Sequence, residues 1–539
     1  MKRFMMVAMI LAVTVSAAYA GNVDTYGIGS KATALGGAFT AYSDDPYAAY
    51  YNPAGLTQID RLVISGGLHI IDPTLDVSDF HVSNTADPQI SGYKDFSDES
   101  PNLFAPHLGA AMPIGDKLAI GIAAYAPWGL EIEWNDNPVE NPGAYNCFHS
   151  YYVREAVTPT VAYKINDKFS FGFGLSLGKS IAGEERKLYV SPDIGNDPVL
   201  GPAVYEGTVA KVNGAVSPYL PAGASLTTAG TAALTQQVMT GAAATAATEA
   251  DRQTYTAYAA ACTQLIAANP GASAADASAL LGNATRNKFN GVPATDHGAH
   301  TEAELEDSFN YSFNIGLMYK PGETLTLGLT YRSKTAAEFE GDVEKNGVKV
   351  AEAALDYDHP DQIQFGIRYV PESNKNLSFE FDLVWTHWSI NDVQSALIDP
   401  NLPVEIMPGV EPNKLTESTF RRDWEDTKQI RFGVEWKINE MFTLRSGYFY
   451  DPSPIPDDTL DLIWTDADKK TYSVGCGMNF GNFSVDTVFQ YIDVEKARYL
   501  GGESEGFNHS YEGSGISKEV SMSADAHLLG AGLTLNYKF

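Results

Sequence analysis

The stretch LGAGLTLNYKF, residues 529–539, alternates without a break between apolar residues and small or polar ones. Successive side chains of a β-strand point to opposite faces, so the alternation predicts a strand with one apolar face. The apolar positions are Leu529, Ala531, Leu533, Leu535, Tyr537 and Phe539. Strands of soluble sandwiches alternate in the same way, so other parts of the chain must decide between a soluble sheet and a membrane barrel.

The N-terminal residues indicate export. Lys2 and Arg3 precede an apolar run over residues 4–15, and Ala18-Tyr19-Ala20 has the small-x-small spacing of a signal peptidase site. We therefore expect a signal peptide over residues 1–20 and a mature chain that begins near Gly21, outside the cytoplasm.

The rest of the chain favours a barrel. No later segment approaches the roughly 20 uninterrupted apolar residues of a membrane helix, so a membrane-spanning fold would have to be a closed β-barrel. The sequence contains 29 Tyr, 25 Phe and 48 Gly, which suits many strands with aromatic girdles at the membrane surface. The length would also accommodate several soluble domains, and the strand count decides between these alternatives.

The alternating pattern recurs, and short turns separate its copies. The clearest copies are residues 169–177, 311–319, 325–331, 377–385 and 432–436. The expected short turns are 115–117, 166–168, 321–323, 371–376, 439–440 and 481–482, all rich in Gly, Asn, Asp or Pro. With short periplasmic turns and both termini periplasmic, six such turns predict an all-β transmembrane antiparallel barrel of about 14 strands within residues 61–539. The predicted strands are 61–72, 103–114, 117–127, 150–165, 168–190, 305–320, 324–343, 358–370, 377–390, 424–438, 441–451, 469–480, 483–499 and 521–539.

The charge balance is acidic, with 36 Lys and Arg against 67 Asp and Glu, which argues against nucleic acid as a partner. Much of the acid lies in the predicted outer loops 76–99 and 451–468, where we interpret it as solvated surface. Calcium binding by Asp457, Asp458 and Asp461 is the less favoured interpretation, because no EF-hand spacing is present.

The three cysteines do not form a disulfide framework. Cys147 and Cys262 both fall in predicted outer loops, where they could pair, whereas Cys476 lies in a predicted strand.

Residues 21–60 do not alternate and are too few for an independent domain. They contain short helix-like pieces interrupted by Pro46 and Pro53. A barrel of this size has a lumen that would leak unless it were filled, so these residues predict an N-terminal hatch, or plug, inside the barrel.

The hatch sequence resembles a known family. Residues 34–56, with Asp44-Asp45 and Asn52-Pro53-Ala54-Gly55, are similar to the hatch of the FadL/TodX family of outer-membrane transporters for long-chain fatty acids and aromatic hydrocarbons. Further similar segments follow in order at 102–106, 127–130, 133–136, 331–333, 339–342 and 453–458.

The resemblance implies a transport route. A hydrophobic molecule is captured by outer loops, passes to an apolar pocket, and leaves sideways into the membrane through a gap in the barrel wall. The family's third strand is kinked at the position of Pro127-Trp128-Gly129, which makes these residues the expected lateral opening. The alternative is that Pro127 only ends the strand at its outer rim. Asn52-Pro53-Ala54 is the expected gating element of the hatch.

A ligand with a carboxylate would need a cation or amide near the pocket mouth. The candidates on strands near the outer loops are Lys179, Arg186, Arg332 and Lys334.

The segment 198–302 is a long Ala-, Thr- and Gly-rich insertion in a predicted extracellular loop. Its helix-like stretches are 235–261 and 272–281, with Gly282 as the expected C-cap of the second. It is interpreted as a cap over the mouth or as a surface arm. His297 and His300 have a metal-like spacing that is interpreted as incidental.

These features predict transport of fatty acids or related hydrocarbons across the bacterial outer membrane, by a monomer that contacts membrane lipid. Aromatic hydrocarbon or alkane uptake is the nearest alternative, followed by a general porin, a surface-binding barrel and a lipid hydrolase. We expect no catalytic residues, no metal site and no cofactor, since no nucleophile motif such as Gly-x-Ser-x-Gly is present.

Overall fold

A computed structural model describes residues 27–83, 87, 90–189, 200–247, 249–288, 298–400, 416–500, 507, 510, 511 and 519–539. The predicted signal peptide and His297 lie outside these residues. The chain divides into two compact units. Unit 1 comprises residues 1–187, 299–508 and 519–539, and unit 2 comprises residues 188–298 and 509–518.

Unit 1 is built from antiparallel strands that follow the alternating segments of the sequence. Their bounds are β1 Val63–Val82, β2 Lys94–Ser97, β3 Leu103–Ile114, β4 Leu118–Glu133, β5 His149–Lys164, β6 Phe169–Lys187, β7 His300–Tyr319, β8 Leu325–Arg332, β9 Thr335–Lys345, β10 Val348–His359, β11 Gln362–Tyr369, β12 Leu377–Thr386, β13 Val393–Pro400, β14 Thr416–Arg421, β15 Thr427–Lys437, β16 Phe442–Asp451, β17 Lys469–Phe480, β18 Phe483–Leu500 and β19 Val520–Lys538.

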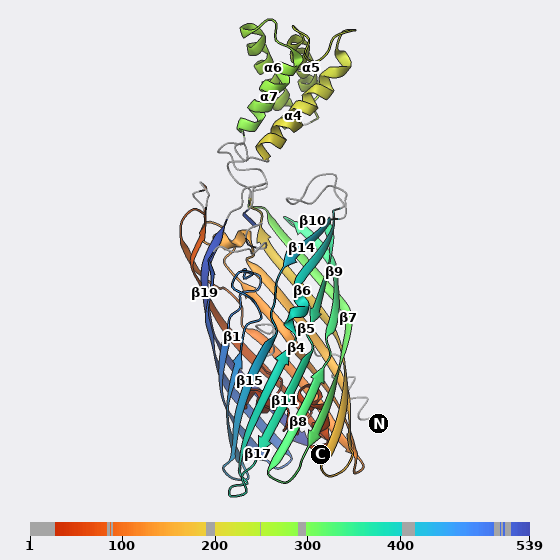
Figure 1. Ribbon diagram of the computed structural model, residues 1–539, viewed down its shortest axis with the longest axis vertical. Helices are drawn as coiled ribbons and strands as arrows, with labels where there is room; N and C mark the ends of the chain where they lie inside the picture. Colours follow the sequence, from red (N-terminus) through yellow and green to blue (C-terminus); the bar gives the residue numbers. More distant parts are fainter. Residues whose placement is uncertain are drawn as a thin grey trace. The chain divides into compact units, whose positions relative to one another are not determined.

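The strands close into a ring, because β1 pairs with β3 on one side and with β19 on the other. Four of the wall strands are each divided into two pieces, β8 with β9, β11 with β10, β12 with β13, and β15 with β14. Counted in this way, the described residues form a closed barrel of 14 tilted strands, seen in Figure 1. The predicted barrel is confirmed.

All six predicted short turns join paired strands, for example residues 115–117 between β3 and β4 and residues 481–482 between β17 and β18. Several strands extend farther than predicted at the opposite end. The strand β7 begins at His300 rather than residue 305, and β1 continues to Val82. The β7 extension alternates charged with small residues, as in Thr301-Glu302-Ala303-Glu304, so an apolar pattern does not mark it.

The apolar face of the terminal strand is on the outside. Leu529, Leu533, Leu535 and Tyr537 are each about two-fifths exposed, whereas Thr534 on the opposite face is buried. An exposed apolar band around a closed barrel is the surface that a membrane covers.

The wall is interrupted in two places. At Pro127 two residues of β4 lie opposite one of β5, since Tyr125 pairs with Ala156 and Trp128 with Arg154. This is a β-bulge. The second interruption crosses four neighbouring strands at 333–334, 360–361, 387–392 and 422–426, where the 3₁₀ turn η4 Trp388–Asn391 is inserted.

The N-terminal segment, residues 27–60, packs inside the ring as α2 Ser30–Ala34, α3 Ala48–Tyr51 and the 3₁₀ helix η1 Pro53–Gln58. Glycines of nine strands make room for it, because a Cβ at any of them would lie under 3.0 Å from an atom of this segment. These are Gly109, Gly121, Gly172, Gly316, Gly328, Gly366, Gly433, Gly447 and Gly475. The segment therefore packs directly against the inner wall.

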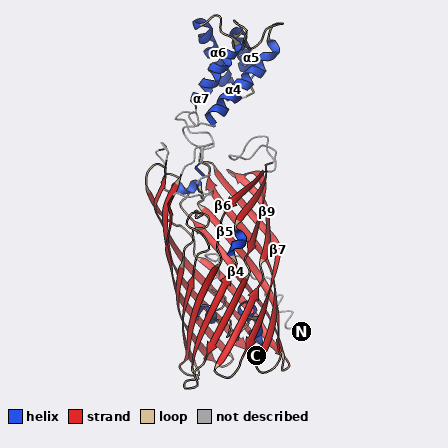
Figure 2. Cartoon of the chain, in the orientation of Figure 1, coloured by secondary structure: helices blue, strands red, loops and turns tan. Residues whose placement is uncertain are grey.

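Unit 2 is helical (Figure 2). Its helices are α4 Leu200–Val216, η3 Ser217–Tyr219, α5 Ala232–Thr245, α6 Glu249–Ala268 and α7 Ala274–Lys288. They enclose their own apolar core, which includes Val216, Met239, Cys262 and Leu281. The helix-like stretch predicted over 235–261 is not one helix, since α5 ends at Thr245 and α6 begins at Glu249.

The predicted C-cap at Gly282 is also wrong, because α7 continues past it to Lys288. Gly282 is instead a contact point, where a Cβ would meet Tyr205 of α4. Within the described residues, no helix is both long and apolar enough to cross a membrane.

The cysteines Cys147, Cys262 and Cys476 are free thiols. Cys147 is buried in unit 1, and Cys262 is buried in the helical core of unit 2. The disulfide bond between Cys147 and Cys262 that the sequence analysis left open is therefore not formed.

Candidate functional site

Asn52 fixes the start of η1 and joins it to the barrel wall. Its Oδ1 accepts a hydrogen bond from the Ala54 amide at 3.1 Å, which caps the 3₁₀ helix. Its Nδ2 donates to the carbonyls of Thr40 at 2.7 Å and Leu317 at 3.1 Å. Asn52 is fully buried, so these three hydrogen bonds are shielded from water.

A second anchor comes from β12, three strand positions along the wall from β7. The Asp382 carboxylate of β12 accepts hydrogen bonds from the amides of Phe39 and Thr40 at 3.0 and 2.9 Å. These amides follow Gly36 and Gly37, which have positive φ values of 66° and 72° and turn the chain after α2. The turn presents two adjacent N–H groups to one anion.

Charged side chains form a third attachment between the N-terminal segment and β15 to β18. Lys31 pairs with Asp44 at 2.6 Å, and the Tyr42 hydroxyl donates to Glu435 at 2.7 Å. Arg445 then bridges Glu435 and Asp486 at 2.7 and 2.6 Å. The Tyr42–Glu435 hydrogen bond thus joins the hatch to the wall, with one ion pair inside the hatch and two inside the wall beside it.

The electrostatics of this attachment depend on pH. Burial lowers the pKa of Lys31, but Asp44, Tyr42 and Glu435 together outweigh burial and raise this pKa above its ordinary value. Burial, with repulsion from Asp44, raises the pKa of Asp45 to about 7. Because the pKa of Asp45 is higher in the folded state, its stabilising contribution is present at low pH and is lost as pH rises through about 7.

We expect hydrogen exchange of amides 44–48, corrected for intrinsic rate, to show lower protection at pH 8 than at pH 6 in wild-type protein. Asp45→Asn keeps the acceptor for the Tyr47 amide, 2.9 Å away, but cannot ionise. Its protection should therefore stay constant between these pH values. The same fall in the variant would contradict the assignment to Asp45.

A cavity lies between the N-terminal segment and the wall. It extends from the β4 bulge, at Pro127 and Trp128, to the second interruption, at His359 and Pro360. Its other lining residues are Tyr50, Tyr125, Arg154, Ser176, Ser312, Phe313, Asn314, Arg332, Ser333 and Thr335. The free volume is about 10 Å³, close to the requirement of one water molecule. A larger ligand can enter only when lining side chains move.

Two buried guanidinium groups line this cavity. Arg154 is 2% exposed, donates to Asn310 at 2.8 Å and to Ser176 at 3.2 Å, and has no partner for its Nη2. Arg332 donates to Gln362 and to the Tyr50 carbonyl, and lies 3.9 Å above the Tyr50 ring. Among the described residues, neither has a carboxylate within ion-pair distance.

The space around the cavity is aromatic. Trp128 stacks on His359 at 5.5 Å and lies edge-on to Trp388 at 5.6 Å. The set continues through Trp424 to Trp464, with ring centroids 5.5 Å apart at each step. We call Trp128, Tyr152, Tyr357, His359, Trp388, Trp424 and Trp464 the aromatic cluster.

The β4 bulge borders a stretch of the wall in which β3 and β4 are not paired, which we call the β4 window. The pairing between β3 and β4 ends at Leu108 and Ala124, and residues 103–107 pair only with β1 among the described residues. The two sides meet again at the Asp98–Trp134 bridge, where the Glu99 amide also donates to the Glu133 carbonyl. Pro127, Trp128 and Gly129 thus lie along one edge of this unpaired stretch.

The four cations predicted to bind a ligand carboxylate do not lie together in the structure. Arg332 lines the cavity, as described. Lys179 pairs with Glu155 at 3.4 Å, Arg186 lies 3.8 Å from Glu184, and Lys334 pairs with Asp358 at 2.7 Å. None of these three lines the cavity.

Sequence reasoning missed Arg154. The signal was present, because Arg154 shares the inward face of β5 with Tyr152, Ala156 and Thr158. A charged residue on a membrane strand is a functional-site hypothesis by default. Two of the three acidic residues considered for calcium have cationic partners, since Asp458 pairs with Arg421 and Asp461 with Arg422.

A closed barrel with an apolar outer band, an N-terminal segment filling its lumen and a small cavity beside a wall window defines a plugged outer-membrane transport protein. The chain belongs to the OMPP1/FadL/TodX family of outer membrane transport proteins, which it matches over residues 8–539. It is a transporter of the bacterial outer membrane and not an enzyme.

Individual relatives are distant. The chain is 22% identical over 517 residues to the long-chain fatty acid transport protein of Escherichia coli O6:H1, covering 90% of each chain. It is 25% identical over 239 residues to outer membrane protein P1 of Haemophilus influenzae, covering 43% of this chain and 48% of that protein.

Solved structures share the fold. A Pseudomonas aeruginosa FadL homologue superposes with a TM-score of 0.65 at 16% identity, covering 97% of this chain and 100% of that one. The Ralstonia pickettii toluene transporter TbuX gives a TM-score of 0.53 at 15% identity, covering 95% and 99%.

Proposed function

We propose that this protein carries long-chain fatty acids, or closely related amphipaths with a carboxylate head, across the outer membrane. The observation that supports this most strongly is the pair Arg154 and Arg332, two buried guanidinium groups in one cavity that form no ion pair with a carboxylate in the described part of the chain. The fatty acid transport protein of Escherichia coli, similar over 90% of both chains, agrees with this choice.

The positive charges of Arg154 and Arg332 are incompletely compensated by their neighbours. A buried charge without a counter-ion is costly, and here only neutral oxygens accept from the two guanidinium groups. A ligand carboxylate would supply the missing anion and accept two parallel N–H bonds, the geometry that arginine favours. The aromatic cluster offers apolar surface for the adjoining chain.

Binding selectivity tests the proposal. A fluorescent fatty acid bound to purified protein is displaced by oleate or by oleyl alcohol, which have equal chain length. We expect oleate to displace it at a concentration at least about tenfold lower, because a charge-assisted hydrogen bond contributes about 1.5–3 kcal/mol. Equal potency of the two competitors would reject recognition of the carboxylate.

Uptake of aromatic hydrocarbons is a second candidate. The aromatic cluster, with several rings 5.5–5.6 Å apart, favours flat apolar ligands, and TbuX is a toluene transporter. A neutral hydrocarbon, however, leaves Arg154 and Arg332 uncompensated. Preferential displacement by toluene over oleate would favour this candidate.

The proposed route ends sideways at the β4 window. Each methylene group exposed to water costs about 0.8 kcal/mol, so an acyl chain gains from passing directly into lipid. Pro127 and Trp128 line the cavity and also border the unpaired stretch of β3 and β4. This supports a lateral exit at Pro127, Trp128 and Gly129. A monomer suffices, since one chain closes the barrel through β1 and β19.

The exit can be tested with a variant that favours a regular strand. Replacing Pro127 and Gly129 by valine should lower fatty acid uptake severalfold while heat-resistant barrel assembly stays normal. Pro113, in β3 beside the short turn, is the matched control, and Pro113→Val should leave uptake unchanged. Unchanged uptake in the Pro127 and Gly129 variant would exclude this exit.

A further inference from the structure

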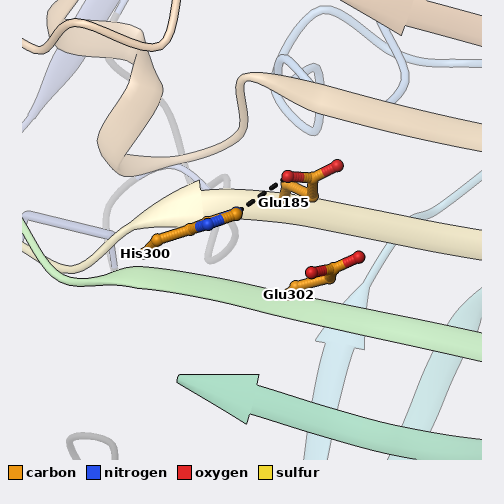
Figure 3. Close-up of side chains that lie close together, drawn as sticks. All are labelled: Glu185, His300 and Glu302. Atoms are coloured by element: carbon orange, nitrogen blue, oxygen red, sulfur yellow. Dashed lines mark hydrogen bonds and ion pairs between the residues drawn. The ribbon is translucent and has the colours of Figure 1, made fainter. Parts of the chain in front are cut away.

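Three side chains with metal-binding atoms converge at the end of β6 and β7 that lies away from the short turns. Glu185 of β6 is directly opposite Glu302 of β7, and His300 begins β7 (Figure 3). One ligand atom of each residue lies within 4.8 Å of the others. The His300 Nε2 is 2.8 Å from Glu185 Oε2. All three side chains are half-buried.

A second imidazole reaches the same carboxylate. The Nδ1 of His149, on β5, is 2.8 Å from Glu185 Oε1, and its Nε2 is 3.4 Å from Glu131. Glu185 thus lies between two histidines. Two imidazoles around a shared carboxylate form a donor set that differs from a plain acidic surface.

The ion pairs of the cluster do not include the Glu302 carboxylate. Among the described residues, its carboxylate has no hydrogen bond or ion pair within range, although it lies opposite Glu185 on one side and Glu344 of β9 on the other. Three carboxylates in one cross-strand row destabilise a sheet unless a cation lies among them. A divalent cation beside His300 would neutralise this row.

We propose that Glu185, His300 and Glu302 bind one divalent transition metal ion of the zinc type, with water as the fourth ligand. Imidazole nitrogen with carboxylate oxygen suits zinc, whereas calcium and magnesium take oxygen ligands. Ligand atoms of a tetrahedral zinc site lie roughly 3.3 Å apart, as follows from bonds near 2.0 Å. Rotation of half-buried side chains supplies this contraction.

The position in the chain indicates what the ion does. The strand β6 ends at Lys187 and β7 begins at His300, and residues 188–298 between them form the main part of unit 2. A metal bound by Glu185 and His300 clamps the two strand ends that lead into this insertion. The ion therefore prevents these ends from separating.

The experiment uses the full-length protein in detergent after removal of metal by a chelator, titrated in a calorimeter with Zn²⁺ and, separately, with Ca²⁺. We expect one saturable site and at least about a tenfold weaker affinity in His300→Ala and Glu302→Gln. Glu306→Gln changes a carboxylate on the same strand outside the cluster and should bind as wild type does.

A second readout separates metal binding from folding. Hydrogen exchange at residues 184–187 and 299–303 should slow on addition of Zn²⁺ in wild type and in Glu306→Gln, but not in His300→Ala. Absence of a saturable site would overturn the proposal. Equal affinities of wild type and His300→Ala, or equal affinities for Zn²⁺ and Ca²⁺, would overturn it as well.

Discussion

Arg154→Met should lower uptake of a labelled long-chain fatty acid by at least about tenfold while uptake of the matching fatty alcohol is unchanged. Methionine fills a similar volume but provides no donor for a carboxylate. Loss of a charge-assisted hydrogen bond weakens binding by about 1.5–3 kcal/mol, which corresponds to roughly 10- to 100-fold in affinity. Measurement of initial uptake rates with both ligands in the same cells separates recognition from assembly.

Two further variants sharpen this result. Arg154→Lys keeps the charge but loses the two-pronged geometry of the guanidinium group. Its fatty acid uptake should therefore lie between that of wild type and that of Arg154→Met. Lys179→Met removes a cation that pairs with Glu155 and does not line the cavity, so it should transport normally. A parallel loss of acid and alcohol uptake in Arg154→Met would indicate a structural role and contradict recognition of the carboxylate.

Asn52→Ala should assemble as a barrel but lose most transport. The variant leaves the buried Thr40 and Leu317 carbonyls and the Ala54 amide without their present partner. Each unsatisfied buried group costs about 1–3 kcal/mol. The barrel ladder does not depend on Asn52, so heat resistance of the barrel should persist while hydrogen exchange of residues 50–56 accelerates.

The hatch also contacts the cavity directly, which connects its arrangement to ligand binding. Arg332 donates to the Tyr50 carbonyl at 2.9 Å, and Asn314 donates to the Ala49 carbonyl at 2.8 Å. A carboxylate that attracts Arg332 would compete with the first contact. Asn52→Asp retains the acceptor for Ala54 but loses both donor bonds, so it should behave like Asn52→Ala. Wild-type transport in both variants would refute gating through Asn52.

The barrel was predictable because its determinants are local. Alternation along residues 529–539 sets which side chains face lipid, and a turn such as residues 115–117 contains the glycine and aspartate that a tight connection requires. The strand extensions escaped prediction, since Glu302 and Glu304 alternate with small residues outside the membrane, where burial in lipid selects no apolar side chain.

The site was harder to predict because it is assembled from distant segments. Arg154 and Arg332 come from different strands, and only the closed ring places them in one cavity. The same holds for the metal cluster, where His300 meets Glu185 across the insertion. Arg332 lines the cavity, whereas Lys334, two residues farther along the chain, pairs with Asp358. No local sequence pattern distinguishes these two cations.

The most direct test of the central claim is uptake of labelled oleate by bacterial cells that lack their own fatty acid transporter, with and without this protein in the outer membrane. We expect the protein to restore oleate uptake at low concentration, with unlabelled oleate competing better than oleyl alcohol. Absence of uptake by cells that contain the folded, heat-resistant barrel would rule out the proposed fatty acid transport.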